Sequence, residues 1–107
     1  MNIVVLITSP NLQEAHKISQ KLIEEKLIAC ANIVERIQSI FWWEGKTDRA
    51  EEVLIILKSK KSLFKKIMKT VRAAHSYKVP EILALPIIDG NPDYLKWISE
   101  SVRKLGG

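Results

Sequence analysis

IACANIVERIQSIFWW, residues 28–43, is rich in β-branched and aromatic residues and shows no helical period. As a single strand it would be about 50 Å long at ~3.3 Å per residue. A domain of this chain length has a radius of gyration of only about 13 Å. The stretch must therefore bend at a bulge, project beyond the domain, or do both.

The residues that follow turn the chain back. EGKTD (44–48) has the composition of a turn, and residues 53–57 form a short apolar strand that returns beside the first. Two strands joined in this way predict an extended antiparallel hairpin.

The flanking segments supply two further strands and three helices. Residue spacing identifies the helices by their apolar stripes, and Asn11 with Glu14 resembles a capping box. Pro86 favours an edge position for the last strand, because proline cannot donate to a ladder. The segments are a strand over 3–9, a helix from Asn11, a helix over 62–74, a strand over 82–88, and a helix from Asn91-Pro92 through Val102 and Leu105, closed by Gly106-Gly107.

This order predicts a single α/β (α+β) domain over residues 1–107. It is a ferredoxin-like βαββαβ sandwich with an extended hairpin between its second and third strands and an additional C-terminal helix. The strands over 3–9 and 53–57 are expected at the centre of the sheet, with helices covering one face.

Composition restricts the protein class. Cys30 is the only cysteine, so no internal disulfide forms. The sequence shows no signal-like segment and no apolar segment long enough to span a membrane, which predicts a cytoplasmic protein without membrane contact. The net charge is +5, and much of it lies in Lys58, Lys60, Lys61, Lys65, Lys66, Lys69 and Arg72. These residues form either a solvated helix face or a track for phosphate, and no sequence-specific nucleic-acid partner is expected.

Four aromatic residues are difficult to bury in one small domain. Trp42 and Trp43 are adjacent on a strand, so they point to opposite faces, and only one can enter the core beneath the helices. Tyr94 and Trp97 form a second apolar shoulder on the last helix. We expect these four residues at an interface between copies of the chain, with a local aromatic cluster as the alternative.

Five segments in register resemble the CutA divalent-cation tolerance family. They are IACANI (28–33), WWEGK (42–46), EV (52–53) with LK (57–58), HSY (75–77) with VPEI (79–82), and DYLKW (93–97). The resemblance implies a PII-like fold, a homotrimer whose long hairpins pair between subunits, and a link to divalent metals such as copper. It implies no enzymatic reaction and no tightly bound cofactor, with copper(II) or another divalent cation as the candidate ligand.

One departure from the family affects the metal ligands. Some bacterial relatives carry a cysteine and a second histidine where this chain has Ile7 and Ala74, so only His75 remains of three soft ligands. A site at His75 would need Glu81, water or a neighbouring subunit. Three roles remain open for His75: a helix-end residue, a metal ligand or a catalytic group.

The other candidates for chemistry have simpler explanations. Cys30 is expected to be a small buried apolar residue, His16 an exposed helix residue, and Glu51 and Glu52 solubilising charges on the hairpin. The sequence contains no phosphate loop, zinc-protease motif or nucleophile elbow, so no motif indicates an enzyme. Three classes remain: a trimeric metal-tolerance protein, a PII-like module that binds small ligands at subunit clefts, and an RNA binder. The last is disfavoured because the two central strands have no aromatic residues for base stacking.

Overall fold

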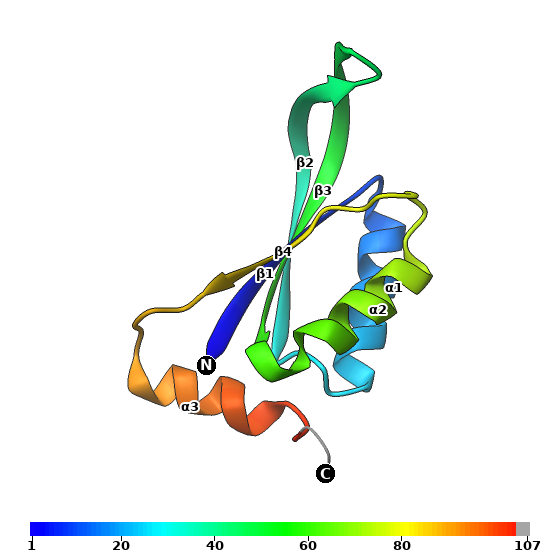
Figure 1. Ribbon diagram of the computed structural model, residues 1–107. Helices are drawn as coiled ribbons and strands as arrows, with labels where there is room; N and C mark the ends of the chain where they lie inside the picture. Colours follow the sequence, from blue (N-terminus) through cyan, green and yellow to red (C-terminus); the bar gives the residue numbers. More distant parts are fainter. Residues whose placement is uncertain (105–107) are drawn as a thin grey trace.

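Four antiparallel strands form one sheet in the order β2-β3-β1-β4. The computed structural model describes residues 1–104, and its strands are β1 (Asn2–Ser9), β2 (Cys30–Trp43), β3 (Lys46–Lys60) and β4 (Ile82–Pro86). Strands β1 and β3 are central and β4 is an edge, as predicted. The ferredoxin-like βαββαβ order with a third helix is confirmed (Figure 1).

Helices α1 (Leu12–Glu24) and α2 (Phe64–Ala74) lie together on one face of this sheet (Figure 1). A 3₁₀ turn, Lys61–Leu63, precedes α2. Alternate residues of β1 and β3 point toward the helices and lose their contact with water, which stabilises the fold by about 25 cal/mol per Å² of apolar surface. The buried residues that meet there include Ile3, Val5, Ile7, Ala15, Ile18, Leu22, Val53, Ile55, Leu57, Ile67 and Val71.

The β2–β3 hairpin both bends and projects. A bulge interrupts the register between Val34 and Ile37, where Arg36 has a φ of 58°. The hairpin rises beyond the helices (Figure 1), and the longest dimension of the molecule is 44 Å. Glu44 and Gly45 close it with φ values of 50° and 77°, which is the conformation of a tight two-residue turn that matches the strand twist.

Several boundaries differ from those expected. Strand β3 starts at Lys46 instead of residue 53, because its polar first half pairs with β2 along the hairpin. Strand β4 ends at Pro86, the last residue paired with β1. Helix α3 (Pro92–Ser101) ends before Val102, which is extended but still buried. The predicted helix positions at Leu105, Gly106 and Gly107 lie outside the described residues.

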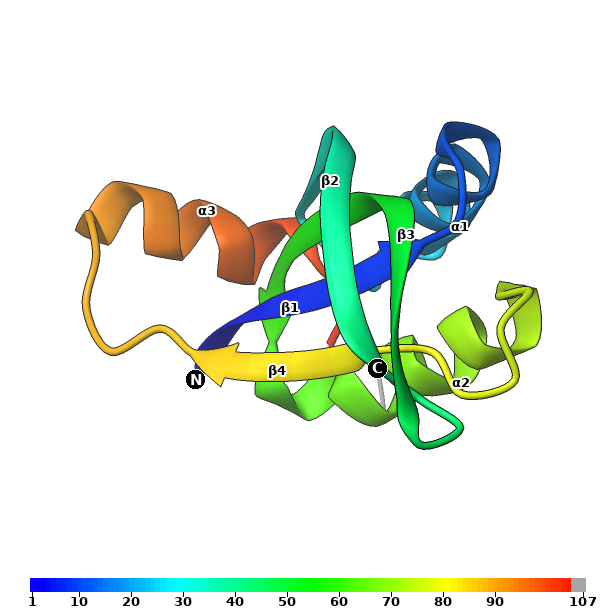
Figure 2. The ribbon, with the colours of Figure 1, turned by 90° about the horizontal axis from the view of Figure 1, so that it is seen from above.

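Helix α3 packs separately from the α1–α2 pair, as Figure 2 shows. The side chain of Asn2, at the start of β1, donates to the Leu95 carbonyl at 3.0 Å and accepts from Ser99 Oγ at 3.1 Å. Within residues 1–104, none of the helices has the length and apolar character needed to cross a membrane.

The sheet face that α1 and α2 leave uncovered is apolar; we call it the open face. Its side chains alternate with the buried set, so the strand register groups them on one side. Leu83 and Leu85 are 53% and 47% exposed, and the others are half-buried. The open face comprises Val4, Leu6, Leu54, Ile56, Leu83 and Leu85.

Candidate functional site

His75 lies where α2 ends and the chain crosses toward β4. It is the C-cap of α2, and its backbone N–H donates to the Val71 carbonyl at 2.8 Å. The position confirms that His75 is a helix-end residue. Its side chain is fully buried, so each ring nitrogen requires a partner.

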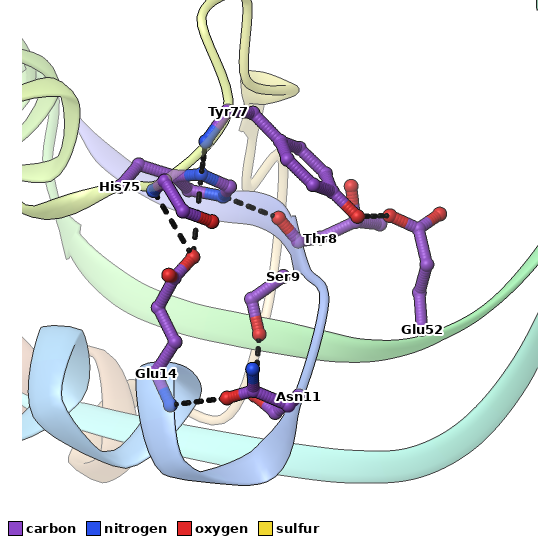
Figure 3. Close-up of polar contacts among 8 residues, drawn as sticks. Thr8, Ser9, Asn11, Glu14, Glu52, His75 and Tyr77 are labelled. Atoms are coloured by element: carbon purple, nitrogen blue, oxygen red, sulfur yellow. Dashed lines mark hydrogen bonds and ion pairs between the residues drawn. The ribbon is translucent and has the colours of Figure 1, made fainter.

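Both ring nitrogens of His75 have such a partner (Figure 3). The backbone N–H of Tyr77 donates to Nδ1 at 3.0 Å, so Nδ1 carries no proton in this contact. The proton is therefore on Nε2, which lies 2.7 Å from the Thr8 carbonyl oxygen and donates to it. The imidazole ties the end of β1 to the end of α2.

Glu14 joins the first turn of α1 to this junction of β1 and α2. We call the junction, formed by Thr8, Glu14, His75 and Tyr77, the His75 corner. Its backbone N–H donates to Asn11 Oδ1 at 2.8 Å, which confirms Asn11 as the N-cap. Its carboxylate does not return to the cap, as in a capping box, but extends to the neighbouring segment (Figure 3). Glu14 Oε2 accepts from the Ser76 backbone N–H at 3.3 Å and lies 3.4 Å from His75 Nδ1.

A second carboxylate, Glu52, completes the cluster from β3. Glu52 is only 8% exposed, and its Oε2 accepts a 2.8 Å hydrogen bond from the Tyr77 hydroxyl. Burial, then the hydrogen bond and the charge of Glu52, and finally the charge of Glu14 raise the pKa of Tyr77 to about 12. The expectation that Glu52 is a solubilising charge is wrong, because Tyr77 covers it; Glu51 is exposed as expected.

A hollow of about 310 Å³ lies next to this cluster, between the start of α1 and the bulge of the hairpin. Oxygen ligands such as its carboxylates suit hard divalent cations better than copper. Yet in the described part of the chain no three His, Cys, Asp or Glu residues are grouped closely enough to hold a metal ion. The lining residues are Pro10, Asn11, Leu12, Glu35, Arg36, Glu51, Glu52 and Val53.

The positions that depart from the family contribute no ligand. Ile7 is fully buried and Ala74 packs against the core. Glu81 is exposed, and none of the hydrogen bonds or ion pairs within residues 1–104 joins it to His75. Both ring nitrogens of His75 already have hydrogen-bond partners, so a metal ion would have to displace one of them. Metal binding by His75 stays a prediction.

Cys30 lies elsewhere in the sheet. Cys30 is level with Val4, four residues along β1 from Thr8, and it lies two strands away on β2. Its offset from the His75 corner is therefore about 13 Å along the strand direction alone, at ~3.3 Å per residue. Cys30 is half-buried rather than buried, and its Sγ lies 3.6 Å from the Tyr94 hydroxyl. This hydrogen bond, followed by burial and the Cys30 charge, raises the pKa of Tyr94.

The four aromatic residues predicted at an interface are all accessible in the single chain. Trp42 and Trp43 are 76% and 61% exposed near the tip of the hairpin. The expectation that one of them enters the core is wrong, because the hairpin carries both beyond the helices. Tyr94 and Trp97 pack together on α3 in a tilted arrangement, with 5.4 Å between their ring centroids, and both remain half-exposed. Their role at an interface stays a prediction.

Comparison with known proteins gives one consistent result. Residues 3–101 match the model of the family described as "CutA1 divalent ion tolerance protein". A divalent-cation tolerance protein CutA from Thermus thermophilus is 45% identical over 101 residues, which cover 94% of this chain and 98% of that protein. The solved structure of the protein so named from that organism superposes with a TM-score of 0.94 at 44% identity and covers 96% of this chain and all of its own.

Other relatives differ in length and in stated location. A chloroplastic CutA 1 from rice is 45% identical over 103 residues, 96% of this chain, but the chain spans only 58% of that protein's length. The solved structure from Archaeoglobus fulgidus, TM-score 0.93 at 44% identity over 96% of this chain and all of its own, is titled as a periplasmic protein. The cytoplasmic location expected here therefore stays a prediction. The family is named for tolerance rather than for a reaction, and these relatives give no support to the PII-like alternative.

Proposed function

The chain belongs to the CutA1 divalent ion tolerance family, and we propose that it acts in divalent-cation tolerance as a homotrimer that binds divalent metal ions. The match over residues 3–101 is the observation that carries this proposal. Two further features, the uncovered apolar surface and the incomplete set of metal ligands, define what association must supply.

The open face and the strand edges support association. Leu83 and Leu85 leave about half of their surface in water on a face where neighbouring side chains are also apolar. Strands β2 and β4 each have one unpaired edge, because they stand at the ends of the sheet order. Proteins normally cover or pair such edges. A closed ring of three copies, each pairing its long hairpin with a neighbour, satisfies both requirements.

Light scattering tests this assembly directly. At micromolar concentration we expect a mass of three times 12.2 kDa, with free monomer appearing only as the chain unfolds. A folded monomer at that concentration would refute the trimer, because the hairpin and the open face would then have no partner.

The metal part of the proposal rests on His75 and neighbouring oxygen ligands. The single chain does not provide a complete site, since the histidine is fully hydrogen-bonded and no group of three ligands forms within residues 1–104. We therefore expect weak binding, with the missing ligands contributed by a second copy. Imidazole suits Cu(II), whereas the carboxylates suit harder ions.

Calorimetric titration with Cu(II) tests the ligand assignment. His75→Ala should weaken Cu(II) binding at least several-fold. His16→Ala provides a matched control, because the chain has two histidines and His16 is exposed on α1. Cys30→Ser should change the affinity little. Equal affinity in the His75 and His16 variants would remove His75 from the site without bearing on the mass of the trimer.

A further inference from the structure

Positive charge is concentrated in the middle of the chain. Residues 53–80 contain eight Lys and Arg residues and no Asp or Glu. The structure divides this group, because the Lys58 side chain lies on the sheet and donates to Asn32, away from α2. The remaining charge is strongest on exposed positions of α2. We call these positions the α2 basic face: Lys65, Lys66, Lys69 and Arg72.

The α2 basic face opposes the stability of its own helix. Lys65 and Lys66 stand at the second and third positions of α2, where the helix dipole favours acidic residues. Lys65 and Lys69 are also like charges at i and i+4, which repel each other. The first turn has no acidic residue and no side-chain cap. Among residues 1–104, none of the ion pairs includes a cation of this face. Charges that destabilise their own helix and have no compensating contact are typical of functional surfaces.

Three of these cations surround one hollow. Lys65, Lys69 and Arg72, together with Met68, line a depression of about 300 Å³. Their spacing of i, i+4 and i+7 places them along one stripe, about 10 Å long at ~1.5 Å per residue. Lysine and arginine bind phosphate oxygens through charge-assisted hydrogen bonds. The stripe therefore suits a ligand whose negative charges follow one another along a line.

The helix lacks what single-stranded nucleic acid would require. Proteins that bind single strands add aromatic residues on which bases stack. The one aromatic residue of α2, Phe64, packs against the hydrophobic core instead. The depression is also short, with cations from one helix alone. Both features favour a compact phosphate chain over a nucleic acid.

We propose that the α2 basic face binds a short linear oligophosphate anion. Lys65, Lys69 and Arg72 contact successive phosphate groups in the depression, and Lys66 adds to the positive field at its end. This site is separate from the His75 corner and from the open face, and it does not depend on metal binding.

Calorimetric titration of the full chain with sodium tripolyphosphate at low salt tests the site. The variant Lys65→Gln/Lys69→Gln/Arg72→Gln should bind about tenfold or more weakly, since each lost contact is charge-assisted. The control Lys17→Gln/Lys96→Gln/Lys104→Gln removes three exposed cations elsewhere. Both variants have a net charge of +5 − 3 = +2. We expect the control to stay within about twofold of the unmodified chain, because contacts rather than net charge determine the affinity.

Thermal unfolding separates loss of the site from loss of the fold. The α2 variant should unfold at the same temperature or higher, because it removes repulsion within the helix. Equal losses in the two triple variants would overturn the proposal, as would inorganic phosphate binding as tightly as tripolyphosphate. Tighter binding of a single-stranded oligonucleotide at equal phosphate concentration would also overturn it and identify a nucleic-acid surface.

Discussion

Replacing Tyr77 with phenylalanine removes the hydroxyl that donates a hydrogen bond to the buried Glu52 carboxylate. The contact is 2.8 Å long, and Glu52 is only 8% exposed, so water replaces the lost donor poorly. A buried acceptor that loses its partner costs about 1–3 kcal/mol, and more when it is charged. We expect Tyr77→Phe to lower the free energy of unfolding by about 2 kcal/mol at neutral pH.

The same contact predicts how stability changes in alkali. Burial and the Glu52 contact raise the pKa of Tyr77 from 10.0 to about 12, so folding favours the protonated phenol. A group whose pKa is raised on folding contributes its full stability below the unfolded pKa. That contribution is lost as the pH rises from about 10 toward about 12. The unmodified protein should therefore lose stability across this interval, and Tyr77→Phe should lose less.

Chemical denaturation at neutral pH and at several alkaline pH values measures both effects. Tyr94→Phe is a matched control, because Tyr94 is the only other tyrosine and contacts Cys30 rather than Glu52. Adding Glu52→Gln completes a double-mutant cycle, in which the coupling energy isolates the pair. Identical alkaline profiles for Tyr77→Phe and the unmodified protein would refute the reasoning, and so would a coupling energy near zero.

Two further predictions concern assembly and charge. Trp43→Ala should lower the unfolding midpoint more than Phe64→Ala and should also release monomer on dilution. Trp43 is 61% exposed in the single chain, and in the proposed trimer its burial would be worth about 2–3 kcal/mol. A larger effect of Phe64→Ala, with unchanged mass on dilution for both variants, would contradict this. Any binding to nucleic acid should be independent of sequence, and its affinity should fall steeply between low and physiological salt, because binding releases counterions from the phosphates. An electrophoretic mobility assay at graded salt concentrations measures this. Sequence-selective binding that persists at about 200 mM salt would revive an RNA-binding function.

The sequence predicts the fold because each element has a local signal. The stretch over 28–43 is too long for a compact domain, and the structure resolves this length by both bending and projecting. The position of the bend had no such signal. Arg36 adopts a positive φ that its residue type does not favour, and neither glycine nor asparagine marks the site. Pairing along the hairpin, which is not local, also extends β3 to Lys46.

The candidate site was predicted less completely, because its contacts join distant residues. His75 reaches Thr8 across 67 positions, and Ser76 reaches Glu14 across 62. The sequence around Glu52 reads as a polar hairpin, but the hydroxyl of Tyr77, 25 positions away, donates a hydrogen bond to its carboxylate. Composition and periodicity describe neighbours along the chain, so they identify His75 as a helix end but do not predict these three long-range contacts around it.

The His75 contacts also set a limit on the proposed metal function. A metal ion that binds Nδ1 must displace the Tyr77 backbone N–H, and one that binds Nε2 must displace the proton given to the Thr8 carbonyl. Either choice leaves one buried polar group without its partner, at a cost of about 1–3 kcal/mol. Since 1.4 kcal/mol is tenfold in affinity, this cost weakens binding by about 5- to 150-fold relative to an unencumbered imidazole. The contacts of the His75 corner thus serve mainly to join β1, α1 and α2. A metal ion can use it only by opening that junction, which accounts for the weak Cu(II) binding that we expect.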